Sequence, residues 1–213
     1  MFILKKQSIT IEQLYLLLAR YLGIQNWWPA ASVPEMLCGM ILVQNTSWNS
    51  AARSLANLMR ATCFDIGALR ALKKQTLEKL IKPSGFQHAK AKYLYNILTM
   101  YQDHFSELCQ LSTKALRKTL LQVSGIGNET ADILLLYLFE RSTFAADKYT
   151  RNLFFKLTGN KHSYTSLKRL VENNTNFSTF DAQEFHALLD EYGKLKNDPL
   201  HICKKYILQT SHS

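Results

Sequence analysis

Residues Leu121–Arg151 read LQVSGIGNETADILLLYLFERSTFAADKYTR, and the expected fold is built outward from this stretch. The segment 113–122, which leads into it, has leucines at helical spacing with lysine and arginine between them, so it predicts a helix with a basic outer face. A second helix is expected over 129–139, because this segment is apolar nearly all round, as buried helices are. The stretch therefore predicts two helices joined by a short turn.

Gly125 and Gly127 form that turn. Glycine adopts backbone conformations that other residues avoid, and it lets another backbone come close. Asn128 can cap the helix that follows, since its side chain can accept from the first amides. A helix, a Gly-x-Gly turn and a second helix present bare amide donors at a helix N-terminus, which suits a DNA phosphate. For the glycines alone, an ordinary turn between two helices is the alternative.

The sequence around this turn resembles the helix-hairpin-helix glycosylases of the endonuclease III superfamily. Their hairpin has the form L-P-G-[IV]-G-x-x-T-A, and an aspartate follows it in a small apolar run. The matching residues here are Val123-Ser124-Gly125-Ile126-Gly127-Asn128-Glu129-Thr130-Ala131 and Phe144-Ala145-Ala146-Asp147. The resemblance covers most of the chain and implies an all-α, two-lobed fold with the active cleft between the lobes. Residues 26–139 would form a central lobe with both DNA-binding hairpins, and residues 1–25 plus 140–213 would form the second lobe.

Composition agrees with a nucleic-acid partner. The chain has 213 residues, 47% of them hydrophobic, so it can bury a core. It carries 26 Lys and Arg against 16 Asp and Glu, a net charge of +10. This balance favours a polyanionic partner, although it does not separate DNA from RNA or an acidic membrane.

The sequence shows no secretion signal and no apolar run of about eighteen residues, so we expect neither secretion nor a membrane span. The cysteines stand singly, which suits reduced thiols in a cytoplasm better than disulfides or a metal site. They are Cys38, Cys63, Cys109 and Cys203. We expect a cytoplasmic monomer without membrane contact, associated with the nucleoid if the source is bacterial.

Near the N-terminus, the spacing of Thr10 and Gln13 is that of a capping box, which predicts a helix from Thr10 to Leu22. Two adjacent tryptophans and a proline follow, at Trp27, Trp28 and Pro29. Their rings must point to opposite sides of an extended chain, so one of them is poorly buried or faces a cavity. Such a ring can stack on a nucleobase, and especially on a cationic one. The alternative is that both rings fill the interface between the lobes.

The next helix is predicted to begin at a second capping box, Ser32-x-x-Glu35, and to end at Gln44-Asn45-Thr46-Ser47-Trp48. In the superfamily this loop reads Q-x-[TS], and its glutamine enters the duplex where the target base was removed. Gln44 is the matching residue. A neutral amide suits that hole because it can hydrogen-bond to an orphaned base. Considered alone, Gln44 would be an ordinary polar residue at a helix C-terminus.

Between Arg70 and Lys92 the chain has seven basic residues and one acid, Glu78, which is more than a solvated face requires. Within this segment, residues 81–92 look like the superfamily's first hairpin, of the form [PG]-x-G-[FY]-x-x-x-K-A. The resemblance implies that Gly85, Lys90 and Lys92 bind phosphate, and a plain surface turn is the alternative. It likewise assigns DNA binding to Gly125, Gly127, Asn128 and Thr130 in the second hairpin.

A helix over Phe180–Lys196 carries a sequence that resembles the superfamily motif H-x-x-[LIM]-x-x-[HY]-G-K. Members with an iron–sulfur cluster continue into four closely spaced cysteines, whereas only Cys203 follows here. Four thiolates are needed to hold such a cluster, so we expect no cluster, no other cofactor and no metal. The role of Lys194 at the end of the motif is left open.

The residues at two positions predict the chemistry. Members of the superfamily that nick the backbone carry lysine where this chain has Glu129, and a carboxylate cannot form an imine, so we expect a monofunctional glycosylase. Lys148 and Lys194 are near in sequence, but neither matches the nucleophile. Asp147 is expected to stabilise the positive charge that builds on the sugar as the N-glycosidic bond breaks. The alternative is that Asp147 only caps the helix expected at Tyr149–Leu157.

The expected base pocket combines flat apolar walls with a negative charge, which suits a base that is already cationic. Its residues are Trp27, Trp28, Pro29, Trp48 and Glu129. This combination looks most like the 3-methyladenine DNA glycosylase branch, whose substrate would be double-stranded DNA with a damaged base. Two alternatives remain: an enzyme of the same fold that removes mismatched adenine or thymine, and a non-catalytic DNA-binding module. A glycosylase assay distinguishes the three.

Overall fold

The computed structural model describes residues 6–28 and 30–209, and nearly all of its regular structure is helical. The all-α prediction is confirmed. In chain order the elements are β1 (Gln7–Ile9), α1 (Ile11–Leu22), α2 (Val33–Leu42), α3 (Trp48–Thr62), α4 (Ile66–Ala71), α5 (Lys74–Ile81), the 3-10 turn η1 (Lys82–Ser84), α6 (Gln87–Cys109), α7 (Thr113–Leu120), α8 (Asn128–Tyr137), α9 (Lys148–Thr158), α10 (Tyr164–Asn173), α11 (Thr179–Lys194), α12 (Ile202–Lys205) and β2 (Tyr206–Leu208).

The chain divides into two compact units. Trp28–Ala131 makes one, here called the middle unit, and Met1–Trp27 with Asp132–Ser213 makes the other, here called the terminal unit. The lobes expected from the sequence have their boundaries at 25/26 and 139/140. Those lobe boundaries and the cleft expected between the lobes stay predictions.

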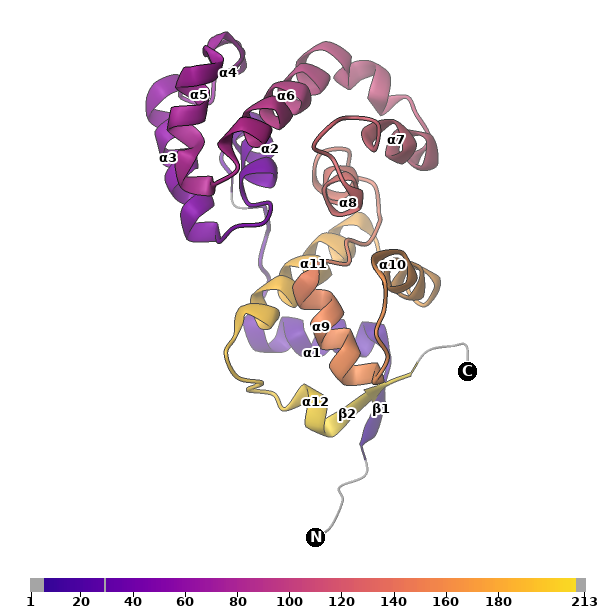
Figure 1. The fold of residues 1–213 in the computed structure, drawn as a ribbon. Helices are drawn as coiled ribbons and strands as arrows, with labels where there is room; N and C mark the ends of the chain where they lie inside the picture. Colours follow the sequence, from indigo (N-terminus) through magenta and orange to yellow (C-terminus); the bar gives the residue numbers. More distant parts are fainter. Residues whose placement is uncertain (1–5, 29, 210–213) are drawn as a thin grey trace. The chain divides into compact units, whose positions relative to one another are not determined.

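The terminal unit is built on α11, which packs on both α9 and α1 (Figure 1). Leu14, Leu18, Phe154 and Phe185 are fully buried at its centre. At the start of α1, Thr10 Oγ1 accepts from the amide of Gln13, and the Gln13 side chain accepts from the amide of Thr10, so the predicted capping box is present.

The two strands of the terminal unit are absent from the sequence prediction. They pair in parallel, with Gln7 opposite Tyr206 and Ile9 opposite Leu208. Each has 3 residues, which is too short to show an alternating pattern in the sequence.

In the middle unit, α2 packs on α3 and α6, and α5 packs on the same two helices. Ser32 caps α2 as predicted by accepting from the amide of Glu35. The second half of the predicted capping box is wrong, because the Glu35 carboxylate accepts from the amide of Ala31 and not from that of Ser32. The Glu35 carboxylate thus satisfies the amide of a residue just before the first turn of the helix.

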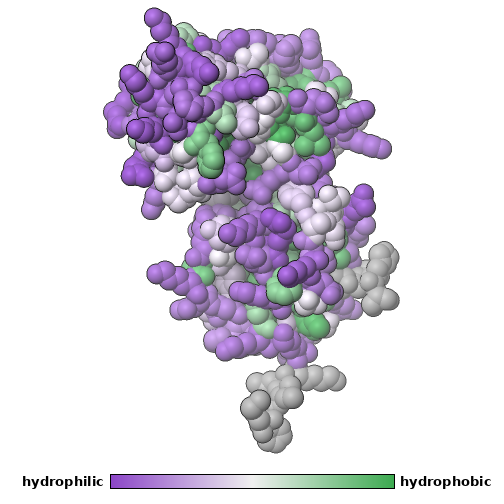
Figure 2. Space-filling model, in the orientation of Figure 1, coloured by the Kyte–Doolittle hydropathy of each residue, from purple (hydrophilic) through white to green (hydrophobic). Residues whose placement is uncertain are grey.

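Hydrophilic side chains cover most of the face of both units that is seen in Figure 2. None of the helices in the described ranges is both long enough and apolar enough to cross a membrane.

Candidate functional site

The second hairpin, residues 121–128 between α7 and α8, needs glycine at its first glycine position. Gly125 has φ +101°, and a Cβ added there would lie 2.6 Å from the Cβ of Tyr93 on α6. A Cβ on Gly127 would meet nothing within 4 Å, so this side of the turn is open. Asn128 is the first residue of α8, and its Oδ1 accepts from Arg117 Nη2 at 3.1 Å. The start of α8 therefore has an open approach on the Gly127 side.

Gln44 lies against this hairpin in the middle unit. Its Nε2 donates to the carbonyl oxygen of Gly125 and to Oγ1 of Thr130, each at 3.1 Å. The Thr130 side chain is buried, so its hydroxyl serves the structure of the hairpin. The duplex entry expected of Gln44 stays a prediction, and it requires that these two hydrogen bonds break.

The first hairpin, residues 81–87, joins α5 to α6 through η1. Gly85 has φ +68° and Phe86 has φ +50°, and both lie in the left-handed region. The Phe86 side chain is 69% exposed, a large apolar surface at the tip of a turn whose neighbour Lys82 is also exposed. The site residues expected from the sequence do not include Phe86, although an aromatic residue in a Pro/Gly turn with basic neighbours was a usable signal.

Lys90, in the first turn of α6, is buried with 2% of its surface exposed. Its Nζ donates to the carbonyl oxygens of Leu42 and Ser84, each at 2.8 Å. Burial lowers the pKa of Lys90 to about 8, because a charged amine loses its hydration there. The phosphate contact predicted for Lys90 is therefore wrong.

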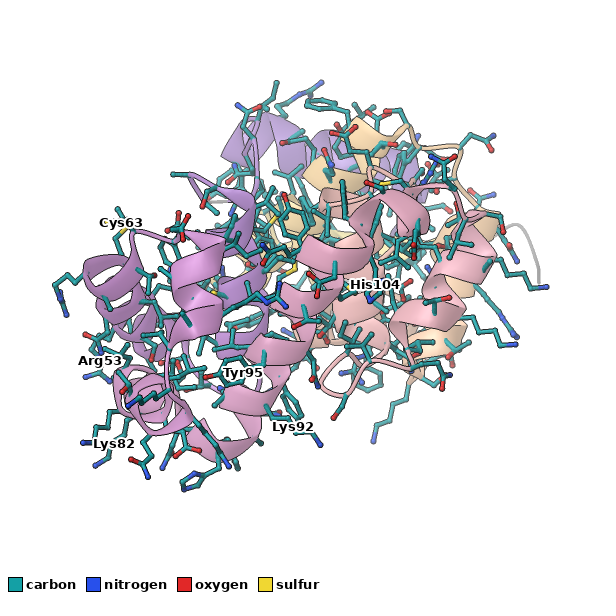
Figure 3. The ribbon with its side chains drawn as sticks, turned by 90° about the horizontal axis from the view of Figure 1, so that it is seen from above. Arg53, Cys63, Lys82, Lys92, Tyr95 and His104 are labelled. Carbon is teal, nitrogen blue, oxygen red and sulfur yellow. The ribbon has the colours of Figure 1, made fainter. Side chains whose placement is uncertain are left out.

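The other basic residues of the 70–92 segment are Arg70, which is held in a close ion pair, and a group of exposed lysines, of which Lys74 lies 3.9 Å from Glu78. Arg70 forms an ion pair with Asp103, with 2.8 Å between Nη1 and Oδ1. Lys82 and Lys92 point outward from η1 and α6 in Figure 3, and so does Arg53 from α3. The exposed lysines are Lys73, Lys74, Lys79, Lys82 and Lys92. This exposed group supplies the positive surface around the first hairpin.

Asp147 lies at the start of α9 in the terminal unit, where it is the N-cap. Its Oδ1 accepts from the amide of Thr150 at 2.7 Å, so the capping role considered as an alternative is present. The residue is 8% exposed and follows the buried run Phe144, Ala145 and Ala146. In the described part of the chain no donor is hydrogen-bonded to Oδ2, which leaves this oxygen for a water or a sugar.

The segment that carries Asp147 has no regular structure and is anchored by α10. Glu172 Oε1 accepts from the amide of Phe144 at 3.0 Å and from the hydroxyl of Thr143 at 2.9 Å. Lys168 Nζ lies 2.5 Å from the same carboxylate and 3.1 Å from Oδ1 of the fully buried Asp132 on α8. These contacts fix Thr143 and Phe144, which lie shortly before Asp147 in the chain.

Trp27 is held by residues of α11. The carboxylate of Glu184, which is 2% exposed, accepts from the amides of Gln25 and Asn26 at 2.7 Å each and so fixes the turn before the indole. Lys194 Nζ lies 5.3 Å from the Trp27 ring centroid, which is a cation–π distance. The position of Lys194, left open by the sequence, is thus on the face of this indole.

His186 also lies next to this indole, with its ring centroid 5.8 Å from that of Trp27. Burial lowers the pKa of His186, although Asp147 and Asp190 act in the opposite direction. The Tyr137 hydroxyl donates to the carbonyl of Gln183 at 3.1 Å and lies 2.8 Å from Nδ1 of His186. Because the hydroxyl has one hydrogen, Nδ1 is assigned as the donor to the Tyr137 oxygen.

The remaining expected pocket residues lie in the middle unit or outside the described residues. Trp28 packs on α2, where its Nε1 would lie 3.7 Å from a Cβ added to Gly39. Trp48 is the first residue of α3 and is 40% exposed, and Glu129 is exposed in the first turn of α8. Pro29 lies outside the described residues. The two adjacent indoles therefore belong to different units.

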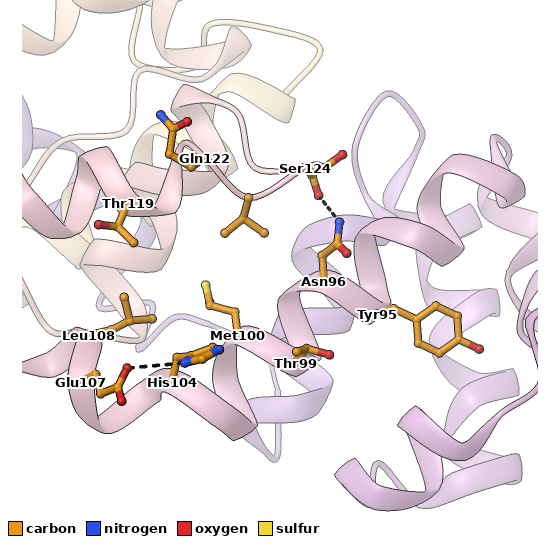
Figure 4. Close-up of a pocket in the computed structure, with 11 residues that line it drawn as sticks. Tyr95, Asn96, Thr99, Met100, His104, Glu107, Leu108, Thr119, Gln122 and Ser124 are labelled. Atoms are coloured by element: carbon orange, nitrogen blue, oxygen red, sulfur yellow. Dashed lines mark hydrogen bonds and ion pairs between the residues drawn. The ribbon is translucent and has the colours of Figure 1, made fainter.

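A separate pocket of about 560 Å³ lies in the middle unit between α6, α7 and the second hairpin (Figure 4). Its lining includes Asn96, whose side chain donates to the Ser124 carbonyl at 3.0 Å, and His104, whose Nδ1 lies 3.5 Å from Oε2 of Glu107. The pocket is distinct from the expected base pocket, whose residues do not line it. Across the described ranges, no three His, Cys, Asp or Glu side chains are grouped to hold a metal ion.

Residues 38–177 match the family described as HhH-GPD superfamily base excision DNA repair protein. A protein of Methanocaldococcus jannaschii named as a DNA repair glycosylase is 35% identical over 191 residues, which are 86% of this chain and 87% of the relative. Endonuclease III of Sulfolobus acidocaldarius is 27% identical over 174 residues, which are 79% of this chain and 76% of the relative.

Solved structures of DNA repair enzymes have a similar fold. The H. pylori 3-methyladenine DNA glycosylase bound to 1,N6-ethenoadenine is similar with a TM-score of 0.75 and 25% identity, over 89% of this chain and 99% of that one. A trapped endonuclease III–DNA covalent intermediate is similar with a TM-score of 0.72 and 15% identity, over 92% of this chain and 94% of that one, and this likeness shows the fold alone.

Proposed function

Because the chain belongs to the HhH-GPD superfamily of base excision DNA repair proteins and is a DNA repair glycosylase, we propose that it is monofunctional and removes cationic alkylated purines such as 3-methyladenine. The product is an abasic site in an intact strand. Duplex DNA with a damaged base is the substrate.

The observation that carries this proposal is the buried Asp147 carboxylate with Oδ1 fixed by the amide of Thr150. As the bond between C1′ and N9 of the base breaks, the base leaves with the bonding electrons and its positive charge is neutralised. Positive charge then develops on the sugar, and the second carboxylate oxygen stabilises it. A water adds to C1′ and releases one proton, so the reaction is a hydrolysis.

Strand nicking requires an amine nucleophile, and three lysines are the candidates for it in addition to the hairpin position. Glu129 occupies the hairpin position where the nicking relatives carry lysine, and a carboxylate forms no imine. Burial alone would lower the pKa of Lys194, but the hydrogen bonds to Asp190 and Glu191 raise it, so the amine stays protonated and is a poor nucleophile. Lys90 has the lowered pKa that an amine nucleophile needs, yet it is bonded inside the middle unit. Lys148 is exposed next to Asp147 and is the lysine that the assay must exclude.

A cationic base suits an indole such as Trp27, because the ring attracts positive charge. The Lys194 ammonium lies 5.3 Å from the ring centroid, so stacking of the base requires that this ammonium move. Such a base also leaves without help from a general acid, so the reaction needs only a negative charge at the sugar, which is the role proposed for Asp147. The similarity to the H. pylori 3-methyladenine DNA glycosylase supports the same substrate class.

The proposal is tested by incubating the protein with duplexes that contain methylated purines, mismatched adenine or mismatched thymine, and by measuring released bases by mass spectrometry. We expect release of methylated purines at least about tenfold faster than release of either mismatched base, a difference of about 1.4 kcal/mol in barrier. Preferred release of a mismatched base would favour the mismatch glycosylases, and tight duplex binding without any release would favour a DNA-binding module.

A further inference from the structure

The turn that follows α2 is hydrogen-bonded to both hairpins of the middle unit. Leu42 is the last residue of α2, and its carbonyl oxygen accepts from Lys90 Nζ at 2.8 Å. Two residues later, Gln44 Nε2 donates to the carbonyl of Gly125 and to Thr130 Oγ1. The same short segment of chain is thus tied to the first hairpin through Lys90 and to the second through Gln44.

Lys90 reaches the first hairpin through its second hydrogen bond. Nζ donates to the carbonyl oxygen of Ser84, the last residue of η1, at 2.8 Å. The ammonium therefore spans a carbonyl at the end of α2 and a carbonyl in the hairpin turn. Each carbonyl lies at the end of a helix, where carbonyl oxygens have no amide partner within the helix.

The same turn is fixed from α3. Ser54, which is fully buried, has its Oγ 3.1 Å from the Ser84 amide and 2.8 Å from the Ser84 hydroxyl, and it donates to the carbonyl of Ile81 at 3.2 Å. Ser84 is itself 1% exposed. Gly85 and Phe86, both with positive φ, follow directly, so the tip of the hairpin projects from a fixed base.

We propose that Lys90 is a positioning residue for duplex binding, which holds the first hairpin to the end of α2 so that both hairpins are preset for the phosphates of one duplex. Lys90 touches no phosphate. A binding surface that is ordered before the ligand arrives loses less conformational freedom on association, and this is the source of the affinity that Lys90 contributes. The inference rests on the proposed function only in taking duplex DNA as the ligand.

The test compares Lys90→Met with Lys92→Met in the full chain. Each change removes one positive charge from α6, but Lys90 is buried and Lys92 is exposed. Affinity for an undamaged duplex is measured over a range of KCl concentrations, and circular dichroism checks that each variant is folded. The slope of log affinity against log salt counts phosphate contacts, at about one unit per contact.

We expect Lys90→Met to lower affinity by about tenfold with an unchanged salt slope, and Lys92→Met to lower the slope by about one unit. A slope lowered by about one unit for Lys90→Met, or an unchanged affinity, would overturn the proposal. If Lys90→Met does not fold, Ser54→Ala tests the same point, because it loosens Ser84 from α3 without changing charge. Ser54→Ala should then weaken binding at constant slope, and unchanged binding would overturn the proposal.

This experiment uses no damaged base, so its outcome does not depend on the proposed excision activity. If the wild-type chain binds duplex but excises nothing, the proposed function fails while the positioning role of Lys90 is still decided by the salt series. If the wild-type chain binds no duplex at all, both proposals fail.

Discussion

Replacing Asp147 by Asn separates the two roles that this carboxylate combines. Its Oδ1 accepts from the amide of Thr150 at 2.7 Å, and Asn is as good an N-cap as Asp. The amide therefore keeps the cap and the size of the side chain but removes the negative charge. We expect the free energy of unfolding to change by no more than a few tenths of a kcal/mol, which is the scale of a retained cap.

The excision rate should respond very differently. A charge or donor aimed at the reacting centre in a dry site is worth about 2.7 to 4 kcal/mol of barrier, or about 10² to 10³ in rate. Asp147 is 8% exposed, so its charge is little screened by water and this range applies. The assay is single-turnover release of a methylated purine with protein in excess, which isolates the chemical step from product release.

Asp147→Ala is the matched variant, because it removes both the cap and the charge. It should lose about 1 kcal/mol of stability and also the excision activity. If Asp147 only caps α9, the pattern changes: Asn would excise at nearly the wild-type rate, and Ala would be less stable but active. Near-normal excision by Asp147→Asn would refute the catalytic role.

Three further predictions concern the supports of the site. Lys168→Met removes the ammonium that lies 3.1 Å from the carboxylate of the fully buried Asp132, and it should lower the free energy of unfolding by about 3 kcal/mol in chemical denaturation. A loss below about 1 kcal/mol would contradict the anchoring role given to this cluster. Burial lowers the pKa of Lys90 from 10.5 to about 8, so between pH 8 and pH 10.5 the unfolded chain binds more protons than the folded chain. In this range the free energy of unfolding of the wild type should therefore rise with pH, relative to that of Lys90→Met, by up to about 1.4 kcal/mol per pH unit. Parallel curves of stability against pH for the two proteins would contradict this. Trp48→Ala should reduce excision by about tenfold or more without changing the salt slope of duplex binding, because stacking acts after the base is flipped; unchanged excision would make Trp48 a bystander.

The sequence predicted those features whose signals are local. The capping box and the apolar spacing gave α1 closely, because a helix was expected from Thr10 to Leu22 and α1 runs from Ile11 to Leu22. The glycine turn and the Asp in its apolar run also identified the superfamily, which the matches to known relatives confirm. Such signals survive in a single sequence because caps and turns depend on neighbouring residues.

Burial of polar residues was the main failure, although part of it was readable. Lys90 and Lys92 are both lysines two positions apart, yet one is buried and the other exposed. Lys90 lies at helical spacing from the buried Leu94 and Ile97, so the period of α6 already placed it on the inner face. The partner carbonyl of Leu42 lies 48 positions away in the sequence, and no local pattern could have named it.

The pairing of β1 with β2 was also beyond the sequence. Gln7 and Tyr206 come from opposite ends of the chain, and only the packing of the terminal unit brings them together. The same holds for Glu184, whose carboxylate binds the amides of Gln25 and Asn26. Neither contact has a signature in residue type or spacing.

The central claim is that this protein releases a cationic base by hydrolysis and leaves the strand intact. The most direct measurement incubates it with a 5′-labelled duplex that carries a single 3-methyladenine, and resolves the strands with and without alkali and with borohydride present. The account predicts release of the base, strand breaks only after alkali, and no covalent adduct with borohydride. Strand breaks without alkali, or a trapped adduct, would show a lysine nucleophile and contradict the account, and so would an intact base after prolonged incubation.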